Sequence, residues 1–146
     1  MVTRPSPRRS ENMRRVKSKD TALELYVRKA IHTAGFRYRL HDRKMPGKPD
    51  IVLPRYRTAI FVHGCFWHGH GCRRSARPTS NREFWDAKLD RNIVRDSVAQ
   101  EELSRAGWRV EIVWECSVDE DVGRVVSGLR AFRSNLRDRM RKSAPI

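Results

Sequence analysis

The sequence predicts a single α/β domain in which helices flank a mixed central β-sheet. Two patterns carry this prediction. Apolar residues recur at helical spacing in three segments, and short alternating or continuous apolar runs lie between those segments. The chain has 146 residues, 38% of them hydrophobic, which suits one domain around one core. We expect a flexible, basic N-terminal arm over residues 1–18 and a folded domain over residues 19–142.

The first half of the domain is expected to form a helix followed by three strands. Thr-Ala-Leu-Glu at 21–24 has the form of a capping box, and apolar residues follow it at helical spacing up to Gly35. Residues 36–40 alternate apolar and basic side chains, as in a half-buried strand. Residues 50–53 and 58–62 are two short apolar runs around a turn, and this spacing favours a hairpin.

The second half is expected to form a loop, a helix, a strand and a last helix. Residues 63–72 are rich in Gly and His, so we expect no regular structure there. A second capping box at 80–83 opens a long helix, and residues 108–114 alternate strictly, as in a strand. The last helix is expected to start at a cap formed by Asp119 or Asp121, and it becomes strongly basic towards its end.

The charge of the chain indicates a polyanionic partner. Lys and Arg total 32 against 17 Asp and Glu, a formal charge of +15. Nucleic acid is the usual partner of so basic a small domain, and an anionic membrane surface is the alternative. No apolar run approaches the roughly 20 residues of a membrane span, and the first ten residues do not resemble a secretory signal. We therefore expect a cytoplasmic protein.

Cysteine and histidine gather around one loop and indicate a zinc site. The three cysteines are an odd number, which argues against a disulfide framework. Residues 63–72 hold two of them and three histidines, and Cys116 follows a predicted strand that could lie beside the strand ending at Val62. Cys3His is a common structural zinc set. The fourth ligand would then be His63, His68 or His70.

A second constellation has the ligands that magnesium prefers. Pairing of the two hairpin strands would set Asp50 roughly opposite Val62, so the carboxylate, the Val62 carbonyl and the His63 ring could share one sheet edge. Magnesium takes oxygen ligands and is usually held by one or two carboxylates plus substrate phosphate. Glu24 is acidic too, but the capping box accounts for it.

Basic and aromatic residues offer a DNA-binding surface. The predicted arm is rich in Arg and Lys, which include Arg14, Arg15 and Lys17, and such groups neutralise phosphates without regard to sequence. Phe66 and Trp67 are large aromatics in a Gly/His loop with no core to enter. Wedging between base pairs would give them a use.

Four sequence blocks together resemble the very short patch repair (Vsr) endonucleases. They are Pro-Gly-Lys-Pro-Asp at 46–50, Phe-Val-His-Gly-Cys-Phe-Trp-His-x-His-x-Cys at 61–72, Glu-Phe-Trp at 83–85 and Val-Trp-Glu-Cys at 113–116. The resemblance implies a fold related to type II restriction enzymes, so that residues 19–142 would form an endonuclease domain. It also implies a nick 5′ to the thymine of a T·G mismatch left by deamination of 5-methylcytosine.

The resemblance further implies a role for each motif residue. Asp50 and the Val62 carbonyl would bind catalytic magnesium, and His68 would be the general base. Glu24 and His63 would assist at the scissile phosphate. A structural zinc ion would be held by Cys65, His70, Cys72 and Cys116. An aromatic wedge would enter the major groove beside the mismatch, and it would consist of Phe66, Trp67 and Trp85. Met13 of the arm would lie on the minor-groove side.

Two other functions compete with mismatch repair. One is a restriction-type or structure-specific endonuclease that cuts fully paired or branched DNA. The other is a zinc-containing DNA-binding module without catalysis, which would leave Asp50, His63 and His68 without a use. The repair hypothesis implies a protein that works as a monomer, because nicking one strand needs one active site. It also implies association with the nucleoid and action before downstream repair proteins.

Overall fold

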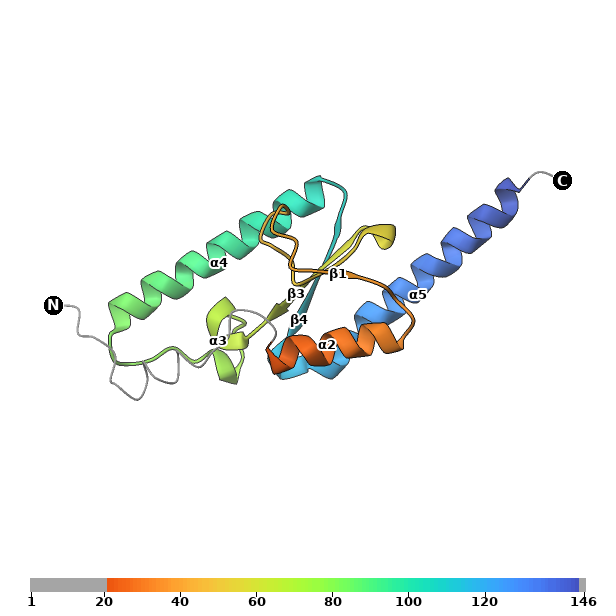
Figure 1. Ribbon diagram of the computed structural model, residues 1–146. Helices are drawn as coiled ribbons and strands as arrows, with labels where there is room; N and C mark the ends of the chain where they lie inside the picture. Colours follow the sequence, from red (N-terminus) through yellow and green to blue (C-terminus); the bar gives the residue numbers. More distant parts are fainter. Residues whose placement is uncertain (1–20, 145–146) are drawn as a thin grey trace.

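The computed structural model describes residues 21–144, in which four helices and a four-stranded sheet form a single α/β domain (Figure 1). The helices are α2 (Ala22–Thr33), α3 (Cys65–His68), α4 (Arg82–Arg105) and α5 (Val118–Ser143). The strands are β1 (Arg39–Leu40), β2 (Ile51–Leu53), β3 (Thr58–His63) and β4 (Arg109–Trp114). Met13, Arg14, Arg15 and Lys17 lie outside the described residues.

The sheet is mixed, as the sequence predicted. Its strand order is β1-β2-β3-β4, with antiparallel pairs at β1–β2 and β2–β3 and a parallel pair at β3–β4. The parallel pair requires a crossover, and α4 provides it. The register matches Val62 with Val113 and His63 with Trp114, so β3 and β4 end side by side.

Helices cover both faces of the sheet because side chains of β3 alternate between them. Ile60 and Val62 pack with α2 and α5 in the larger core cluster, whereas Ala59 and Phe61 pack with Leu103 of α4 in a smaller one. Figure 1 shows α4 on one side of the sheet and α2 with α5 on the other. This arrangement is the predicted α/β sandwich.

Two expected features of the first half and the loop differ in the structure. The strand expected at 36–40 shortens to Arg39–Leu40, because Phe36 is fully buried in the core and anchors the chain after α2. Residues 63–72 were expected to be irregular, but His63 ends β3 and Cys65–His68 form one helical turn. That turn is closed by Gly69 in the left-handed conformation, where an added Cβ would lie 2.4 Å from Ile93 Cδ1.

The starts of the two long helices also differ from expectation. The N-cap of α4 is Asn81 in the left-handed conformation, without a side-chain cap bond, so the capping box at 80–83 is wrong. The N-cap of α5 is Ser117 rather than an aspartate. The Asp121 carboxylate instead accepts hydrogen bonds from the Trp114 amide and the Ser117 hydroxyl, which fixes the turn between β4 and α5.

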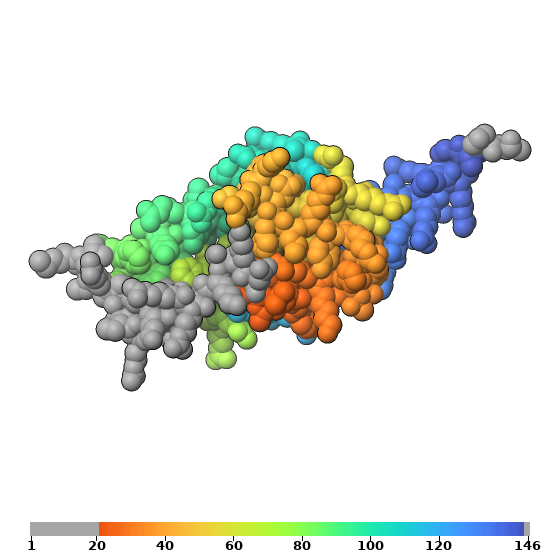
Figure 2. All heavy atoms as spheres, in the orientation of Figure 1, coloured from red at the N-terminus to blue at the C-terminus, as the bar shows by residue number. Residues whose placement is uncertain are grey.

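The last part of α5 extends past the body of the domain. Leu129 is the last buried residue of the helix, and six basic side chains follow within residues 130–142. Figure 2 shows this part standing clear of the rest of the molecule. None of the helices in the described part of the chain combines the length and apolarity that a membrane span requires.

Candidate active site

One cavity, of about 670 Å³, collects seven of the residues singled out in the sequence. It lies where β3 ends, between the start of α2 and the turn of α3. The seven residues in its lining are Glu24, Asp50, Val62, His63, Phe66, Trp67 and His68. The hairpin of β2 with β3 brings Asp50 beside the end of β3, and the chain passes from there directly into the turn of α3.

Asp50 stands immediately before β2 and is held by the neighbouring strand. Its Oδ2 accepts a hydrogen bond of 2.7 Å from the Val62 amide. The register pairs Ile51 with Ile60, which is one residue away from the expected alignment of Asp50 with Val62, yet the carboxylate still spans to Val62. Burial raises the pKa of Asp50 to about 6, and the nearby Glu24 carboxylate adds to this rise. The site therefore favours a cation next to Asp50.

His68 is oriented by a carboxylate that the sequence did not reveal. His68 Nδ1 lies 2.5 Å from Asp96 Oδ2, between α3 and α4. An ionised carboxylate only accepts hydrogen bonds, so Nδ1 carries the proton and Nε2 keeps its lone pair. Asp96 also lines the cavity. It follows His68 by 28 residues in a largely polar helix, and no local pattern distinguishes it from its neighbours.

His63 stacks on His68 and stays neutral. The two rings are parallel within 2° at a centroid distance of 3.7 Å. Burial, followed by the proximity of His68, lowers the pKa of His63 to about 3. One ring nitrogen of each histidine and a carboxylate oxygen of Asp96 lie within 4.8 Å of one another. His63 is thus a neutral partner at the bottom of the cavity.

Glu24 does more than cap a helix. Its amide donates to the Thr21 hydroxyl at 3.2 Å, as the capping box predicts. Its buried carboxylate, however, places Oε2 3.3 Å from Arg28 Nη2 and 3.5 Å from His41 Nε2. His41 Nδ1 in turn lies 3.9 Å from Asp50 Oδ1. Arg28 and His41, which the sequence analysis did not single out, thereby connect the two carboxylates.

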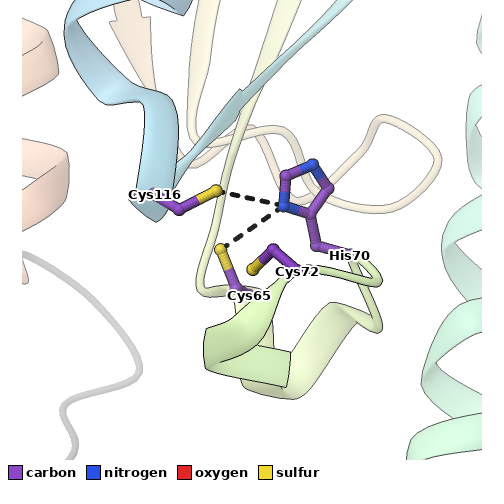
Figure 3. A group of neighbouring side chains, drawn as sticks. All are labelled: Cys65, His70, Cys72 and Cys116. Atoms are coloured by element: carbon purple, nitrogen blue, oxygen red, sulfur yellow. Dashed lines mark hydrogen bonds between the residues drawn. The ribbon is translucent and has the colours of Figure 1, made fainter. Parts of the chain in front are cut away.

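The predicted zinc ligands come together beside the cavity. The Nδ1 atom of His70 lies 3.6 Å from Cys65 Sγ and 3.2 Å from Cys116 Sγ, and Cys72 completes a group whose ligand atoms are all within 4.8 Å (Figure 3). A tetrahedral zinc ion with ordinary bond lengths would separate sulfur and nitrogen by about 3.5 Å. The cluster therefore fits zinc, and it selects His70 from the three histidines of the loop.

The protonation of the thiols agrees with a cation at this place. Burial raises the pKa of Cys65 to about 12. Desolvation also acts against ionisation of Cys72, but hydrogen bonds, the one with His70 first, outweigh it and lower its pKa to about 6. Three adjacent thiolates repel one another unless a cation replaces their protons. A bound zinc ion would supply that charge and cross-link β4 to the loop.

Aromatic side chains form one wall of the cavity. Phe66 and Trp67 are half-buried and in edge contact, with ring centroids 5.0 Å apart. Trp85 lies behind them at 5.7 and 6.1 Å and is only 2% exposed. In this conformation Trp85 supports the two outer rings, while Phe84, 38% exposed, contacts Trp85 edge-on with ring centroids 5.2 Å apart. Of the three aromatic residues predicted for the wedge, Phe66 and Trp67 line the cavity and Trp85 does not.

A strand-end carboxylate, a carboxylate-oriented imidazole and half-buried aromatics in the cavity of a strongly basic domain define the class: a hydrolase of nucleic-acid phosphodiesters. The comparisons with known proteins agree. Residues 3–74 match the family model described as DNA mismatch endonuclease Vsr. The chain belongs to the Vsr family of DNA endonucleases, which act on phosphodiester bonds of DNA.

Three relatives illustrate how much of the chain is shared. The type II nicking enzyme V.XorIIP of Xanthomonas oryzae is 46% identical over 131 residues, 89% of this chain and 96% of that protein. The type II nicking enzyme V.NmeAIP of Neisseria meningitidis is 46% identical over 76% of this chain and 79% of its own. The DNA mismatch endonuclease Vsr of Escherichia coli is 43% identical over 75% of this chain and 70% of its own.

Proposed function

We propose that this endonuclease nicks one strand of duplex DNA 5′ to the thymine of a T·G mismatch by magnesium-dependent hydrolysis. The observation that carries the proposal is the shared cavity, in which Asp50 and the His68–Asp96 pair lie beside the Phe66–Trp67 wall. The first two supply the chemistry of hydrolysis, and the wall supplies a surface that can test base stacking.

Asp50 and the Val62 carbonyl fit magnesium. In a strand the N–H and C=O of one residue point to the same side, and the Val62 N–H points to Asp50. The carbonyl therefore faces the same region, and magnesium takes such oxygen ligands together with substrate phosphate. When bound there, the ion would stabilise charge on the phosphorus and on the leaving 3′ oxygen.

His68 acts as the general base. Nε2 takes a proton from the attacking water, and the Asp96 carboxylate stabilises the imidazolium through its hydrogen bond to Nδ1. His63 assists from beneath as a neutral ring, and its buried Nδ1 has no hydrogen-bond partner among the described residues. Glu24, held by Arg28 and His41, maintains the acidic side of the site.

Phe66 and Trp67 wedge beside the mismatched pair from the major groove, supported by Trp85. A mismatched step is cheaper to unstack than a paired one, and unstacking costs about a few kcal/mol per step. In the arm, Met13 presses on the duplex from the minor-groove side, and Arg14, Arg15 and Lys17 neutralise phosphates. Zinc on the cysteine cluster keeps the loop of the wedge in shape. One active site makes one nick, so the enzyme works as a monomer. It acts at the nucleoid, and the nicked strand is then the substrate of downstream repair proteins.

The test uses three end-labelled duplexes that differ only at the centre: a T·G pair, a matching C·G pair and a branched junction. Each is incubated with and without magnesium, and products are sized on a denaturing gel. We expect a magnesium-dependent nick 5′ to the thymine of the T·G duplex only. Cleavage of the paired or branched duplex would keep the active site and assign a different nuclease role. Binding without any cleavage would refute the catalytic proposal.

A further inference from the structure

The active-site cavity has an imbalance of charge that points to its one lysine. Four carboxylates line it, from Glu24, Asp50, Asp96 and Glu115. Among the described residues of the lining, Lys48 supplies the single Lys or Arg side chain. A phosphodiester is itself an anion and is repelled by carboxylates, so a cation other than the one held at Asp50 is needed on its approach.

We propose that Lys48 binds the scissile phosphate and is a further catalytic residue of this enzyme. The proposal rests on the nuclease function proposed above and adds a contact that Asp50 and His68 do not provide. A lysine ammonium is a compact point charge with three donors and suits a non-bridging phosphate oxygen. None of the ion pairs among residues 21–144 includes Lys48, so its charge is not already committed to a carboxylate.

The backbone fixes Lys48 at the edge of the cavity. Its φ is +50°, a left-handed conformation that is uncommon for a residue with a side chain, and Pro49 follows it. Its amide donates to the Met45 carbonyl at 3.0 Å. Gly47, with φ +71°, packs so closely on α4 that an added Cβ would lie 2.6 Å from Ala99 Cβ. The loop is thus a tight turn seated on the helix, two residues before Asp50.

The Lys48 ammonium and the proposed metal site at Asp50 lie at the same end of β2 and would contact the same phosphate. Lys48 and Asp50 are separated only by Pro49, whose fixed φ limits how the loop can move. A phosphate that reaches Asp50 through a cation therefore lies close to Lys48. Phe66 and Trp67 line the same cavity. If they fix the position of the mismatched pair, they also fix which phosphate lies next to Lys48, so we expect Lys48 to contact one particular phosphate.

The experiment measures DNA binding by fluorescence anisotropy without divalent cations added, so that nicking and metal contacts do not contribute. T·G duplexes carry one neutral methylphosphonate, moved in turn through the phosphates that flank the mismatch. For the wild-type protein, we expect neutralisation of the phosphate 5′ to the thymine to weaken binding about tenfold. The Lys48→Met variant is expected to bind the unmodified duplex more weakly than the wild type by a similar factor. Neutralising the phosphate 5′ to the thymine should not weaken binding of this variant any further.

Three variants complete the test. Lys48→Asn removes the charge while tolerating the left-handed backbone, and it should behave like Lys48→Met even if the latter is poorly folded. Lys48→Arg should restore the sensitivity to neutralisation. Lys44→Met, on the same loop but outside the cavity lining, should leave the scan unchanged.

The outcomes separate this proposal from the function it rests on. If each methylphosphonate weakens binding equally for the wild type and both neutral variants, Lys48 touches none of these phosphates and the inference is wrong. If the Lys48-dependent phosphate is not the one at which the denaturing gel places the nick, Lys48 does not bind the scissile phosphate and the inference is wrong. If that phosphate is the site of the nick but does not lie 5′ to the thymine, the Lys48 contact stands and the proposed position of the nick is wrong.

Discussion

Replacing Asp50 with Asn should remove activity and at the same time stabilise the metal-free fold. The carboxylate is partly buried next to Glu24, and its pKa is raised from 3.8 to about 6. Each unit of pKa difference corresponds to about 1.4 kcal/mol, so keeping Asp50 ionised at neutral pH costs up to about 3 kcal/mol of folding free energy. Asn is nearly isosteric, carries no charge and keeps an oxygen that can accept from the Val62 amide.

The pH range of this effect follows from the direction of the shift. Between the unfolded value of 3.8 and the folded value of about 6, the folded protein binds more protons at Asp50 than the unfolded chain does. This contribution to stability is therefore present at low pH and lost as pH rises through about 6. Asp50→Asn does not lose it, so the stability difference between variant and wild type should grow through this range and then stay constant.

The assay is urea unfolding of both proteins at several pH values from about 4 to 7.5, with zinc retained, first without magnesium and then, at neutral pH, with magnesium added. We expect the Asp50→Asn variant to gain up to about 3 kcal/mol relative to wild type across this range, and magnesium to stabilise the wild type alone. A difference that is independent of pH, or magnesium stabilisation of both proteins, would refute the reasoning about Asp50.

Three other perturbations test separate parts of the site. Asp96→Asn should lower the nicking rate about 100-fold while DNA affinity is kept, because the variant no longer stabilises the His68 imidazolium; single-turnover kinetics measure this, and an unchanged rate would contradict it. Cys116→Ala should lose zinc and destabilise the fold, as measured by metal analysis with thermal unfolding; a folded, zinc-free and active variant would disprove the structural role. The double variant Phe66→Ala and Trp67→Ala should bind T·G and C·G duplexes with similar affinity, and retained discrimination would show that the wedge is elsewhere.

The fold and the cysteine–histidine cluster were accessible from sequence because residue alternation identifies the strands and three of the four cluster residues lie in one short loop. Strict alternation at 108–114 identified β4, and its end placed Cys116 beside the loop that holds Cys65 and Cys72. Spacing alone left three histidines as the fourth ligand. The resemblance indicated His70, and the structure brings His70 rather than His63 or His68 to the thiols.

The parts that were missed depend on side chains brought together by tertiary packing. Asp96 lies midway along α4 and meets His68 only because that helix packs against α3. His41 reaches Glu24 and Asp50 from a turn in the left-handed conformation, which alternation of residue types does not encode. The turn of α3 was overlooked because two glycines at its ends resemble loop composition, although they cap it.

The most direct test of the central claim is a competition between mismatched and paired DNA in one tube. T·G and C·G duplexes of identical flanks carry different fluorescent labels, enzyme is in excess, and magnesium starts a single turnover. We predict that the thymine strand of the T·G duplex is nicked at least about 100-fold faster than its paired counterpart, and that magnesium omission stops the reaction. Equal rates on the two duplexes would contradict mismatch-directed nicking, whatever the active-site variants show.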